Sequence, residues 1–338
     1  MSPAVSRRGL LAGTAAVAAA PALLGAAGAP RAGAPRAEVT GGRRRGGRVV
    51  EVSVDSPALG GPGEIALLTP RGWDRRRPGD RWPTLYLLPG GDGDHHVWTA
   101  EFAVQDIPEL ADVLVVMPAM PLFGFCTDWW NHGAGGPPAV ESFHLREVIP
   151  LMEREYGAAP VRAVAGESQG GYGALSYASR NPGMFGAVAA FSGPVHPLAH
   201  PEVWLAGARL VGVDPLAIWG DPVAQRRNWI ARDPYYHVRG LLGTPVYLSS
   251  GDGTRGEREG PDWEEEIFIP GTEEWIERLP DNVVSVTEAI ISREARALTD
   301  RLISVGVQVE AHFHPGTHTG GYGPGELRRA LPVLLGAL

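Results

Sequence analysis

The chain has 338 residues, of which 44% are hydrophobic and 20% are charged, and its formal net charge is −8 at pH 7. This length and composition suffice to bury a large core and exclude a wholly disordered protein, and the negative charge gives no reason to expect nucleic acid as a partner. Cys126 is the only cysteine, so the chain forms no internal disulfide and offers no pair of thiolates to a metal.

The N-terminus has the pattern of an export signal. Arg7 and Arg8 precede an alanine-rich, weakly hydrophobic run over residues 10–27, which is typical of twin-arginine signals. The run is too short and too rich in small residues to favour a permanent membrane helix. We therefore predict a signal peptide over residues 1–36, no transmembrane anchor after processing, and a secreted or cell-envelope protein. Several small-x-small sites leave the cleavage point open, and a disordered tail is the alternative.

The rest of the chain divides into a short polar segment and one long patterned region. Residues 37–48 are rich in glycine and arginine, so we expect a solvated linker there. From Val49 onward, hydrophobic runs alternate with amphipathic segments, which predicts one domain over residues 49–338 with a mainly parallel sheet covered by helices on both faces. The predicted strands are Val49–Val54, Glu64–Leu68, Thr84–Leu88, Val113–Met117, Val161–Ala165, Ala187–Phe191, Val246–Ser249 and Val307–Phe313, and the clearest predicted helices are Val140–Tyr156, Val286–Ile303 and Glu326–Leu335.

The strongest motif is Gly166-Glu167-Ser168-Gln169-Gly170, which fits the pattern G-x-S-x-G. It follows a predicted strand and precedes a predicted helix. A nucleophile elbow needs this context, because a tight turn with small neighbours lets the serine hydroxyl project above the edge of the sheet. We predict that Ser168 is a nucleophile, and the alternative is a serine in an ordinary turn.

A serine nucleophile needs a histidine base, because its hydroxyl is weakly nucleophilic at neutral pH. His318 lies in the loop between the last predicted strand and the last predicted helix, so we predict that it is the base. His312 and His314 lie in or at the end of that strand and are weaker candidates. A metal cluster of these three histidines is the alternative, because residues two apart on a strand share a face. We expect no metal and no cofactor.

Two carboxylates compete to orient the base. Asp252 directly follows the predicted strand Val246–Ser249, where this architecture often carries the acid. Glu288 lies near the start of the next helix, where the helix N-terminus favours an ionised carboxylate. Each also has a structural interpretation, Asp252 as a turn residue and Glu288 as a helix cap.

The oxyanion hole requires two backbone N–H groups, one directly after the nucleophile and one from the loop after an earlier strand. These requirements point to Gln169 and to the region of Gly91, where glycine permits close approach of the backbone to a substrate. The polar residues after Gly91 are interpreted as a loop at the sheet edge rather than as a metal site: Asp92, Asp94, His95 and His96.

Several blocks of the sequence resemble a known family. The blocks are LYLLPGGDGDHHVW, VVMPAMPLFGFCTDWW, GESQGGYGAL, VYLSSGDGT, VTEAIISREARALTDRL and FHPGTHTGGY. In this order they are similar to the esterase D-like α/β-hydrolases, most closely to the secreted mycolyltransferases of the antigen 85 group, over roughly residues 49–338. The resemblance implies an α/β-hydrolase fold, Ser168 as nucleophile, His318 as base, and Gly91 and Gln169 at the oxyanion positions. It places the family's acidic residue on Glu288, which therefore ranks ahead of Asp252.

The sequence also departs from that family. Pro89 stands where the mycolyltransferases have an aspartate, and Thr319–Tyr322 lacks their tryptophan, so contacts that serve sugar binding are missing. Two inserted segments are predicted. Residues 196–240 are interpreted as a wall of the substrate pocket or as plain core, and residues 254–281 as a lid or a solvated excursion.

Together these features predict an exported serine esterase that hydrolyses acyl esters through an acyl-enzyme intermediate, with a small acyl ester or a lipid as substrate. The alternative is an acyltransferase of the mycolyltransferase or diacylglycerol acyltransferase type, with a sugar or lipid hydroxyl as acceptor. A non-catalytic binding module of the cell envelope is a third possibility, against which the complete set of serine, acid and histidine argues.

Overall fold

A computed structural model describes residues 36–263 and 279–338. The predicted signal peptide, apart from Arg36, lies outside the described residues, and so does the central part, residues 264–278, of the segment predicted as a lid or surface excursion.

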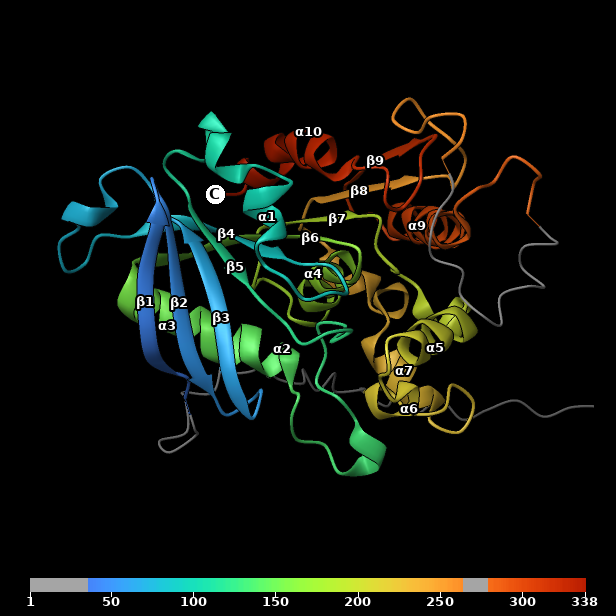
Figure 1. The fold of residues 1–338 in the computed structure, drawn as a ribbon, viewed down its shortest axis with the longest axis horizontal. Coiled ribbons are helices and arrows are strands. Elements are labelled where there is room, and N and C mark those ends of the chain that lie inside the picture. The colour runs from blue at the N-terminus through green and yellow to red at the C-terminus, as the bar shows by residue number, and fades with distance from the viewer. Residues whose placement is uncertain (1–35, 264–278) are drawn as a thin grey trace, which may run out of the picture. The chain divides into compact units, whose positions relative to one another are not determined.

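The core element is a nine-stranded sheet with the strand order β1-β2-β3-β5-β4-β6-β7-β8-β9 (Figure 1). The first four strands in this order pair antiparallel, and the remaining pairs, from β5 to β9, are all parallel. The mostly parallel sheet that the sequence predicted is therefore confirmed. The strands are β1 (Glu38–Gly46), β2 (Val49–Ser56), β3 (Gly61–Leu68), β4 (Trp82–Leu88), β5 (Leu114–Pro118), β6 (Ala158–Glu167), β7 (Ala187–Phe191), β8 (Val246–Gly251) and β9 (Val309–His314).

The predicted linker over residues 37–48 is the part of the fold that requires correction, because strand β1 occupies most of it. Most of its side chains are exposed, and it joins the sheet by backbone pairing with β2. Arg43 and Arg45 also form ion pairs with Glu51 of β2. An exposed edge strand of this kind needs neither a run nor an alternation of hydrophobic residues, so the sequence pattern did not predict it. Charged side chains on such a strand protect it against pairing with the edge of another chain.

Helices cover both faces of the sheet, and the alternation of side chains along the strands explains why. Tyr86 and Leu88 of β4 point to the face where they pack in one hydrophobic cluster with residues of α4 and α9, while Leu85 and Leu87 belong to the opposite cluster, with residues of α1 and α10. Figure 1 shows α2 and α3 on one side of the strands and α1 and α10 on the other. The helices are α1 (Val97–Ala100), α2 (Val140–Ser142), α3 (Ile149–Leu151), α4 (Gln169–Arg180), α5 (Pro201–Leu210), α6 (Pro215–Ile218), α7 (Arg226–Arg232), α9 (Val286–Ser304) and α10 (Gly323–Leu335).

Shorter helical turns complete these elements. The predicted helix over residues 140–156 is present, and its segments η5 (Phe143–Val148) and η6 (Met152–Tyr156) are π-helical continuations of α2 and α3. The 3-10 turns are η1 (Trp73–Arg75), η2 (Val104–Asp106), η3 (Pro108–Leu110), η4 (Asn131–Gly133), η7 (Pro197–Ala199), η8 (Pro234–Tyr236) and η9 (Val238–Leu241).

Residues 196–240 contribute α5, α6 and α7 and a third hydrophobic cluster. Trp219 and Trp229 are buried there with their rings 4.9 Å apart, so these two aromatic residues are core. Trp204 of α5 lies in the same cluster and also lines a cavity, described below. Among the described residues, no helix has the length and apolar character that crossing a bilayer requires.

Candidate active site

Ser168 lies in the sharp turn between β6 and α4. Its backbone angles, φ 52° and ψ −123°, are unusual for a residue with a side chain, and such conformations persist only where the surroundings hold them. The N–H of Ser168 donates to the carbonyl oxygen of Phe191 at 2.8 Å, and its own carbonyl oxygen accepts from the N–H of Gly171 at 2.9 Å. This geometry is that of a nucleophile elbow.

The glycines of the motif are required by contact with the backbone. A Cβ atom on Gly166 would overlap the carbonyl group of Gly170, and one on Gly170 would overlap the carbonyl oxygen of Leu88 on β4. The turn therefore packs directly on the neighbouring strand, which fixes the height of Ser168 above the sheet.

The serine is joined to His318 and Glu288 by a chain of hydrogen bonds. Ser168 Oγ lies 3.1 Å from His318 Nε2, and His318 Nδ1 lies 2.7 Å from Glu288 Oε2. These residues come from three elements: the start of α4, the loop after β9 and the first turn of α9. The parallel sheet brings them together because β6 and β9 end at the same edge.

Glu288 is fully buried and firmly held. Its Oε1 accepts hydrogen bonds from the hydroxyl of Ser192 and from the N–H of Gly251, both at 2.7 Å. Ser285 caps α9, and its Oγ accepts from the N–H groups of Glu288 and His318, each at 3.4 Å. These hydrogen bonds fix the orientation of the carboxylate.

Asp252, the competing acid, contacts a different partner. Its carboxylate accepts from the N–H of Thr254 at 2.9 Å and from the Thr254 hydroxyl at 2.6 Å, so it shapes a local turn. At the same turn, the two ends of the segment between Thr254 and Val283 are joined to each other. Thr254 forms an isolated antiparallel bridge with Val283, and the N–H of Ser285 donates to Gly253 at 3.0 Å.

His312 and His314 do not lie at the serine. His312 Nδ1 is 3.0 Å from Glu326 Oε1, and His314 Nε2 is 4.0 Å from the same oxygen. The alternative cluster of His312 and His314 with His318 is therefore not formed. Glu326, from the first turn of α10, takes the third place.

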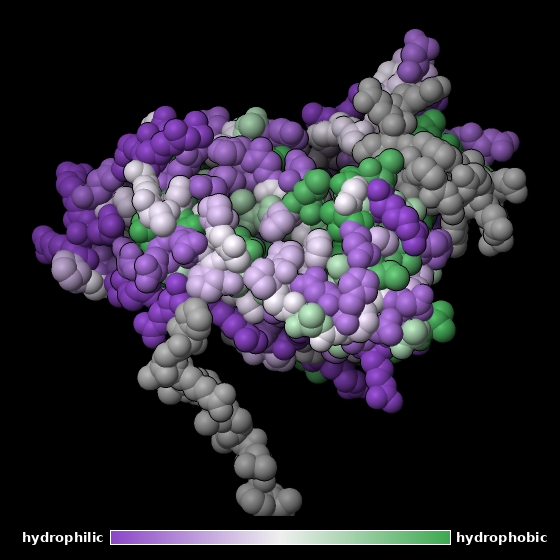
Figure 2. All heavy atoms as spheres, turned by 60° about the horizontal axis from the view of Figure 1, so that its bottom comes forward, coloured by the Kyte–Doolittle hydropathy of each residue, from purple (hydrophilic) through white to green (hydrophobic). Residues whose placement is uncertain are grey.

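A cavity of about 530 Å³ opens beside Ser168, and we call it the apolar lobe. Two of its residues, Leu210 and Val211 at the end of α5, expose 53% and 39% of their surface. Figure 2 shows a face of the molecule on which hydrophobic surface gathers in few places amid a mainly hydrophilic surround. The lobe is lined by Gly90, Gly91, Asp92, Phe123, Glu167, Ser168, Gln169, Val203, Trp204, Gly207, Leu210, Val211, Thr287, Ile291 and His318.

A second cavity of about 310 Å³ shares Asp92, Glu167 and His318 with the first, and we call it the acidic lobe. Its further charged residues are carboxylates, and it also presents aromatic rings. Because the two cavities share His318, they are two parts of one cleft. The acidic lobe is lined by Asp92, Val97, Glu101, Phe102, Glu167, Phe191, Ser192, Thr317, His318, Thr319, Gly321, Tyr322, Gly323, Pro324 and Glu326.

Gly91 and Gln169, the predicted oxyanion residues, both line the apolar lobe next to Ser168. They also pack on each other, since a Cβ on Gly91 would lie 2.8 Å from Gln169 Nε2. Gln169 is the first residue of α4, where the helix supplies no acceptor for the backbone N–H. Its side-chain oxygen accepts from the N–H of Phe125 at 3.1 Å, which holds the side chain against the loop of Phe125.

Glu167, directly before the serine, lies between the two lobes. Burial, and next the neighbouring carboxylates of Asp92, Glu101 and Glu288, raise its pKa to about 7, against the opposing effect of His318. This carboxyl therefore titrates near neutral pH at the meeting point of the cleft.

Sequence reasoning missed Glu259, which holds the loop that carries His318. Its Oε1 accepts from the N–H of Thr317 at 3.0 Å and from the Thr317 hydroxyl at 2.6 Å, and its Oε2 accepts from the hydroxyl of Tyr322 at 2.6 Å. These bonds lower its pKa although burial opposes them. Glu259 and Thr317 are 58 positions apart, so no local sequence pattern predicts their contact.

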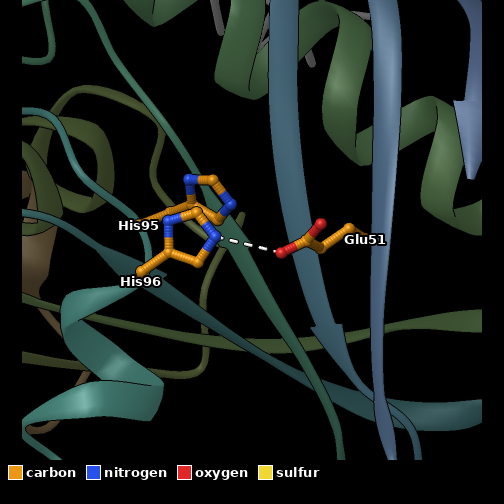
Figure 3. A group of neighbouring side chains, drawn as sticks. All are labelled: Glu51, His95 and His96. Atoms are coloured by element: carbon orange, nitrogen blue, oxygen red, sulfur yellow. Dashed lines mark hydrogen bonds and ion pairs between the residues drawn. The ribbon is translucent and has the colours of Figure 1, made fainter. Parts of the chain in front are cut away.

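The polar loop after Gly91 also forms a cluster that sequence reasoning missed in part. His96 Nδ1 lies 2.7 Å from Asp94, and His96 Nε2 lies 3.0 Å from Glu51 of β2. Figure 3 shows the rings of His95 and His96 side by side, with His96 directed at Glu51. The contact to Glu51 depends on the pairing of distant strands, so the loop sequence alone does not reveal it.

Known proteins resemble this chain in sequence and in fold. A sequence model of a family described as putative esterase matches residues 56–318. Esterase Rv1288 of Mycobacterium tuberculosis is 26% identical over 256 residues, which are 72% of this chain and 50% of that protein. The MPT51 antigen of Mycobacterium leprae is 34% identical over 130 residues, which are 37% of this chain and 42% of that protein. The chain thus spans about half the length of the curated relatives it matches.

The crystal structure of MPT51 from Mycobacterium tuberculosis superposes with a TM-score of 0.60 at 23% identity, over 84% of this chain and 97% of that one. The fold is therefore an α/β-hydrolase fold, as the sequence predicted.

Proposed function

The chain belongs to the putative esterase family, and from this premise we propose that it is a serine esterase that cleaves carboxylic esters through an acyl-enzyme intermediate. The observation that carries the proposal is the hydrogen-bonded chain from Ser168 through His318 to Glu288 at the junction of two cavities of different character.

In the first half of the reaction, Ser168 Oγ attacks the carbonyl carbon of the ester while its proton passes to His318 Nε2. Glu288 accepts the hydrogen bond from Nδ1–H and so keeps the lone pair of Nε2 directed at the serine. It also stabilises the imidazolium that forms. The tetrahedral intermediate then expels the alcohol, which takes the proton from His318, and the acyl group remains on Ser168.

In the second half, water attacks the acyl-enzyme while His318 takes its proton, and the acid is released with Ser168 restored. In both halves the negative charge on the carbonyl oxygen needs donors that are already in place. The backbone N–H groups of Gln169 and Gly91 are the proposed donors, because both residues line the cavity at Ser168.

We assign the two sides of the ester to the two lobes from the character of their lining residues. The apolar lobe suits an acyl chain, because burying hydrocarbon there removes apolar surface from water. The acidic lobe suits the alcohol. Its carboxylates, Asp92, Glu101 and Glu167, favour neutral or cationic leaving groups over anionic ones.

Acyl transfer to a sugar or lipid hydroxyl is the second candidate, and the resemblance of the sequence blocks to the mycolyltransferases of the antigen 85 group favours it. Transfer requires an acceptor held near attack geometry, whereas water is present at very high concentration. Pro89 and the segment Thr319–Tyr322 lack the side chains that serve sugar binding in the family resembled. Hydrolysis is therefore the first proposal.

Export by the twin-arginine route is also part of the proposal and rests on Arg7, Arg8 and the alanine-rich run after them. Replacement of both arginines by lysine should retain the protein inside the producing cell, and fractionation of cells and medium measures this.

The function is tested by reaction with a fluorophosphonate probe and by hydrolysis of p-nitrophenyl esters of increasing chain length. We expect stoichiometric labelling of the wild-type protein and none of Ser168→Ala, with turnover lower by about four to six orders of magnitude in Ser168→Ala and in His318→Ala. A folded wild-type protein that is neither labelled nor active would identify a non-catalytic binding module. Acylated sugar exceeding free acid, in reactions supplied with sugars, would make the protein an acyltransferase.

A further inference from the structure

Two histidines and a glutamate meet where β9 ends and α10 begins. No step of the proposed reaction uses them, although Glu326 also lines the acidic lobe. His312 and His314 are two residues apart on β9 and share a face, with ring centroids 5.2 Å apart. Glu326, in the first turn of α10, is buried and points its carboxylate at both rings. Each residue offers a ligand atom, and these atoms all lie within 4.8 Å of one another.

The hydrogen bonding of His314 leaves a lone pair directed at this point. Its Nδ1 lies 2.8 Å from the carbonyl oxygen of Pro315, which can only accept, so Nδ1 carries the proton. Nε2 of the neutral ring then has a lone pair, and it faces Glu326 Oε1 across 4.0 Å. That distance is too long for a hydrogen bond. A tetrahedral metal ion bonded to both atoms at about 2.0–2.2 Å bridges such a gap after the two atoms approach by roughly half an ångström.

Glu326 is held as a metal-binding carboxylate usually is. The hydroxyl of buried Tyr247 donates to its Oε2 at 2.8 Å. Oε2 also lies 3.1 Å from His312 Nδ1, and Oε1 is the oxygen that lies toward both histidines. His312 Nδ1 lies 3.0 Å from Oε1 and becomes a ligand when its proton moves to Nε2, because the side chain is 36% exposed and Nε2–H can be solvated. Within residues 36–263 and 279–338, the one cation in contact is Arg329, which lies 3.7 Å from Oε1 with its side chain 60% exposed, so it can turn into solvent.

We propose that His312, His314 and Glu326 form a binding site for a divalent transition-metal ion of the Zn²⁺ type. Two imidazole nitrogens and one carboxylate oxygen are a ligand set that Zn²⁺ prefers, with a water completing a tetrahedron. The ion ties β9 to α10, the elements on either side of the loop that carries His318, and so it stabilises that loop without taking part in the reaction.

The cluster of Glu51, His95 and His96 in Figure 3 is a weaker candidate for the same ion. Both oxygens of Glu51 already bind arginines, Arg43 and Arg45. A divalent ion there would stand beside two guanidinium groups, and the Coulomb repulsion would oppose binding. This contrast supplies an internal control.

The test measures metal binding by the full chain, and its readout is independent of esterase activity. The protein is freed of metal with a chelator and then titrated with Zn²⁺ against a chromophoric competitor, and with Co²⁺ while the visible absorption is recorded. We expect one ion per chain, the intense visible bands of a four-coordinate Co²⁺ site, and a higher midpoint of thermal unfolding with Zn²⁺.

Affinity should fall on the order of 100-fold in His314→Ala and in His312→Ala and should be unchanged in His96→Ala. The side chain of His312 is partly exposed, so His312→Ala is the variant expected to fold normally. Circular dichroism checks that each variant is folded. The proposal is wrong if the wild-type protein binds no Zn²⁺ at micromolar concentration, or if His312→Ala binds it as tightly as wild type. Loss of the bound ion in His96→Ala instead would move the site to the cluster in Figure 3 and overturn the assignment.

Discussion

Ser168, the proposed nucleophile, has an unfavourable backbone conformation. At φ 52° and ψ −123° its Cβ atom is crowded by its own backbone, which costs on the order of 1–3 kcal/mol. Ser168→Gly removes the Cβ and should raise the free energy of unfolding by about that amount, whereas Ser168→Ala keeps the Cβ and should gain little. Denaturant unfolding of the two inactive variants measures the difference, and equal stabilities would show that the elbow is unstrained.

A second prediction distinguishes Glu288 from Asp252 as the carboxylate that orients His318. Glu288→Gln leaves His318 with an amide partner and the wrong tautomer, so turnover should fall by roughly three to four orders of magnitude with the fold retained. Asp252→Asn changes only a turn that contacts Thr254, and it should cost less than tenfold. A larger loss in Asp252→Asn, under the same ester assay, would reverse the ranking of the two acids.

Glu167 predicts a dependence on pH. Its pKa of about 7 means that the carboxyl ionises near neutrality beside His318, where a negative charge stabilises the imidazolium of the transition state. His318 must be neutral to act as the base in every variant, so the profile of kcat/KM against pH should contain one ionisation near pH 7 more in the wild type than in Glu167→Gln. The exposed control Glu109→Gln should keep the wild-type profile.

The same group has a signed effect on stability. Folding raises the pKa of Glu167 from the ordinary value of 4.5 to about 7. The contribution of this carboxyl to stability is therefore complete below about pH 4.5 and is lost as the pH rises through 7. Glu167→Gln should then gain stability relative to wild type above pH 7 and not below pH 4.5. If that pH dependence is the same in both proteins, the carboxyl does not titrate near pH 7.

At the scale of elements, the strands and helices with a clear hydrophobic period were predictable, and the contacts between distant elements were not. The strand after residue 245 and the helix after residue 285 begin where the sequence predicted, because buried runs and a serine cap are local signals. Strand β1 was missed because backbone pairing holds it in the sheet.

The candidate site divides in the same way. The elbow at Ser168 is a local strand–turn–helix signal, and it was readable from the sequence. Glu288 and Asp252 could not be separated by spacing alone, because the choice depends on which carboxylate the fold brings to His318. The bonds of Glu259 and the replacement of His318 by Glu326 beside His312 are contacts across the fold, which a single sequence does not display.

Glu259 gives the prediction that belongs to this scale. It ties Thr317 and Tyr322, at the two ends of the loop with His318. Glu259→Ala should lower kcat by roughly tenfold or more while fluorophosphonate still labels Ser168, because the loop loses its anchor and the nucleophile stays in place. Glu257→Ala, an exposed neighbour, is the matched control, and equal activities of the two variants would contradict a positioning role.

At the scale of the whole molecule, the two lobes of the cleft predict selection by charge. For one acyl group, esters of a cationic amino alcohol should have a higher kcat/KM than esters of an anionic hydroxy acid, and the difference should shrink with added salt. Glu101→Gln should reduce the preference, since Glu101 lines only the acidic lobe. A preference that ignores both salt and Glu101 would place the alcohol elsewhere.

The bridge between Thr254 and Val283 bears on how this fold tolerates changes of chain length. The chain leaves the sheet after Gly251, whose N–H donates a hydrogen bond to Glu288. It returns at Val283, two residues before Ser285, the N-cap of α9. Since the two ends of this segment are joined to each other, a change of length between Thr254 and Val283 should not be transmitted to Glu288, which Gly251 holds by a hydrogen bond. The place of the acid is thereby independent of the length of the neighbouring segment, so an insertion of a few residues there should leave the contact between Glu288 and His318 intact.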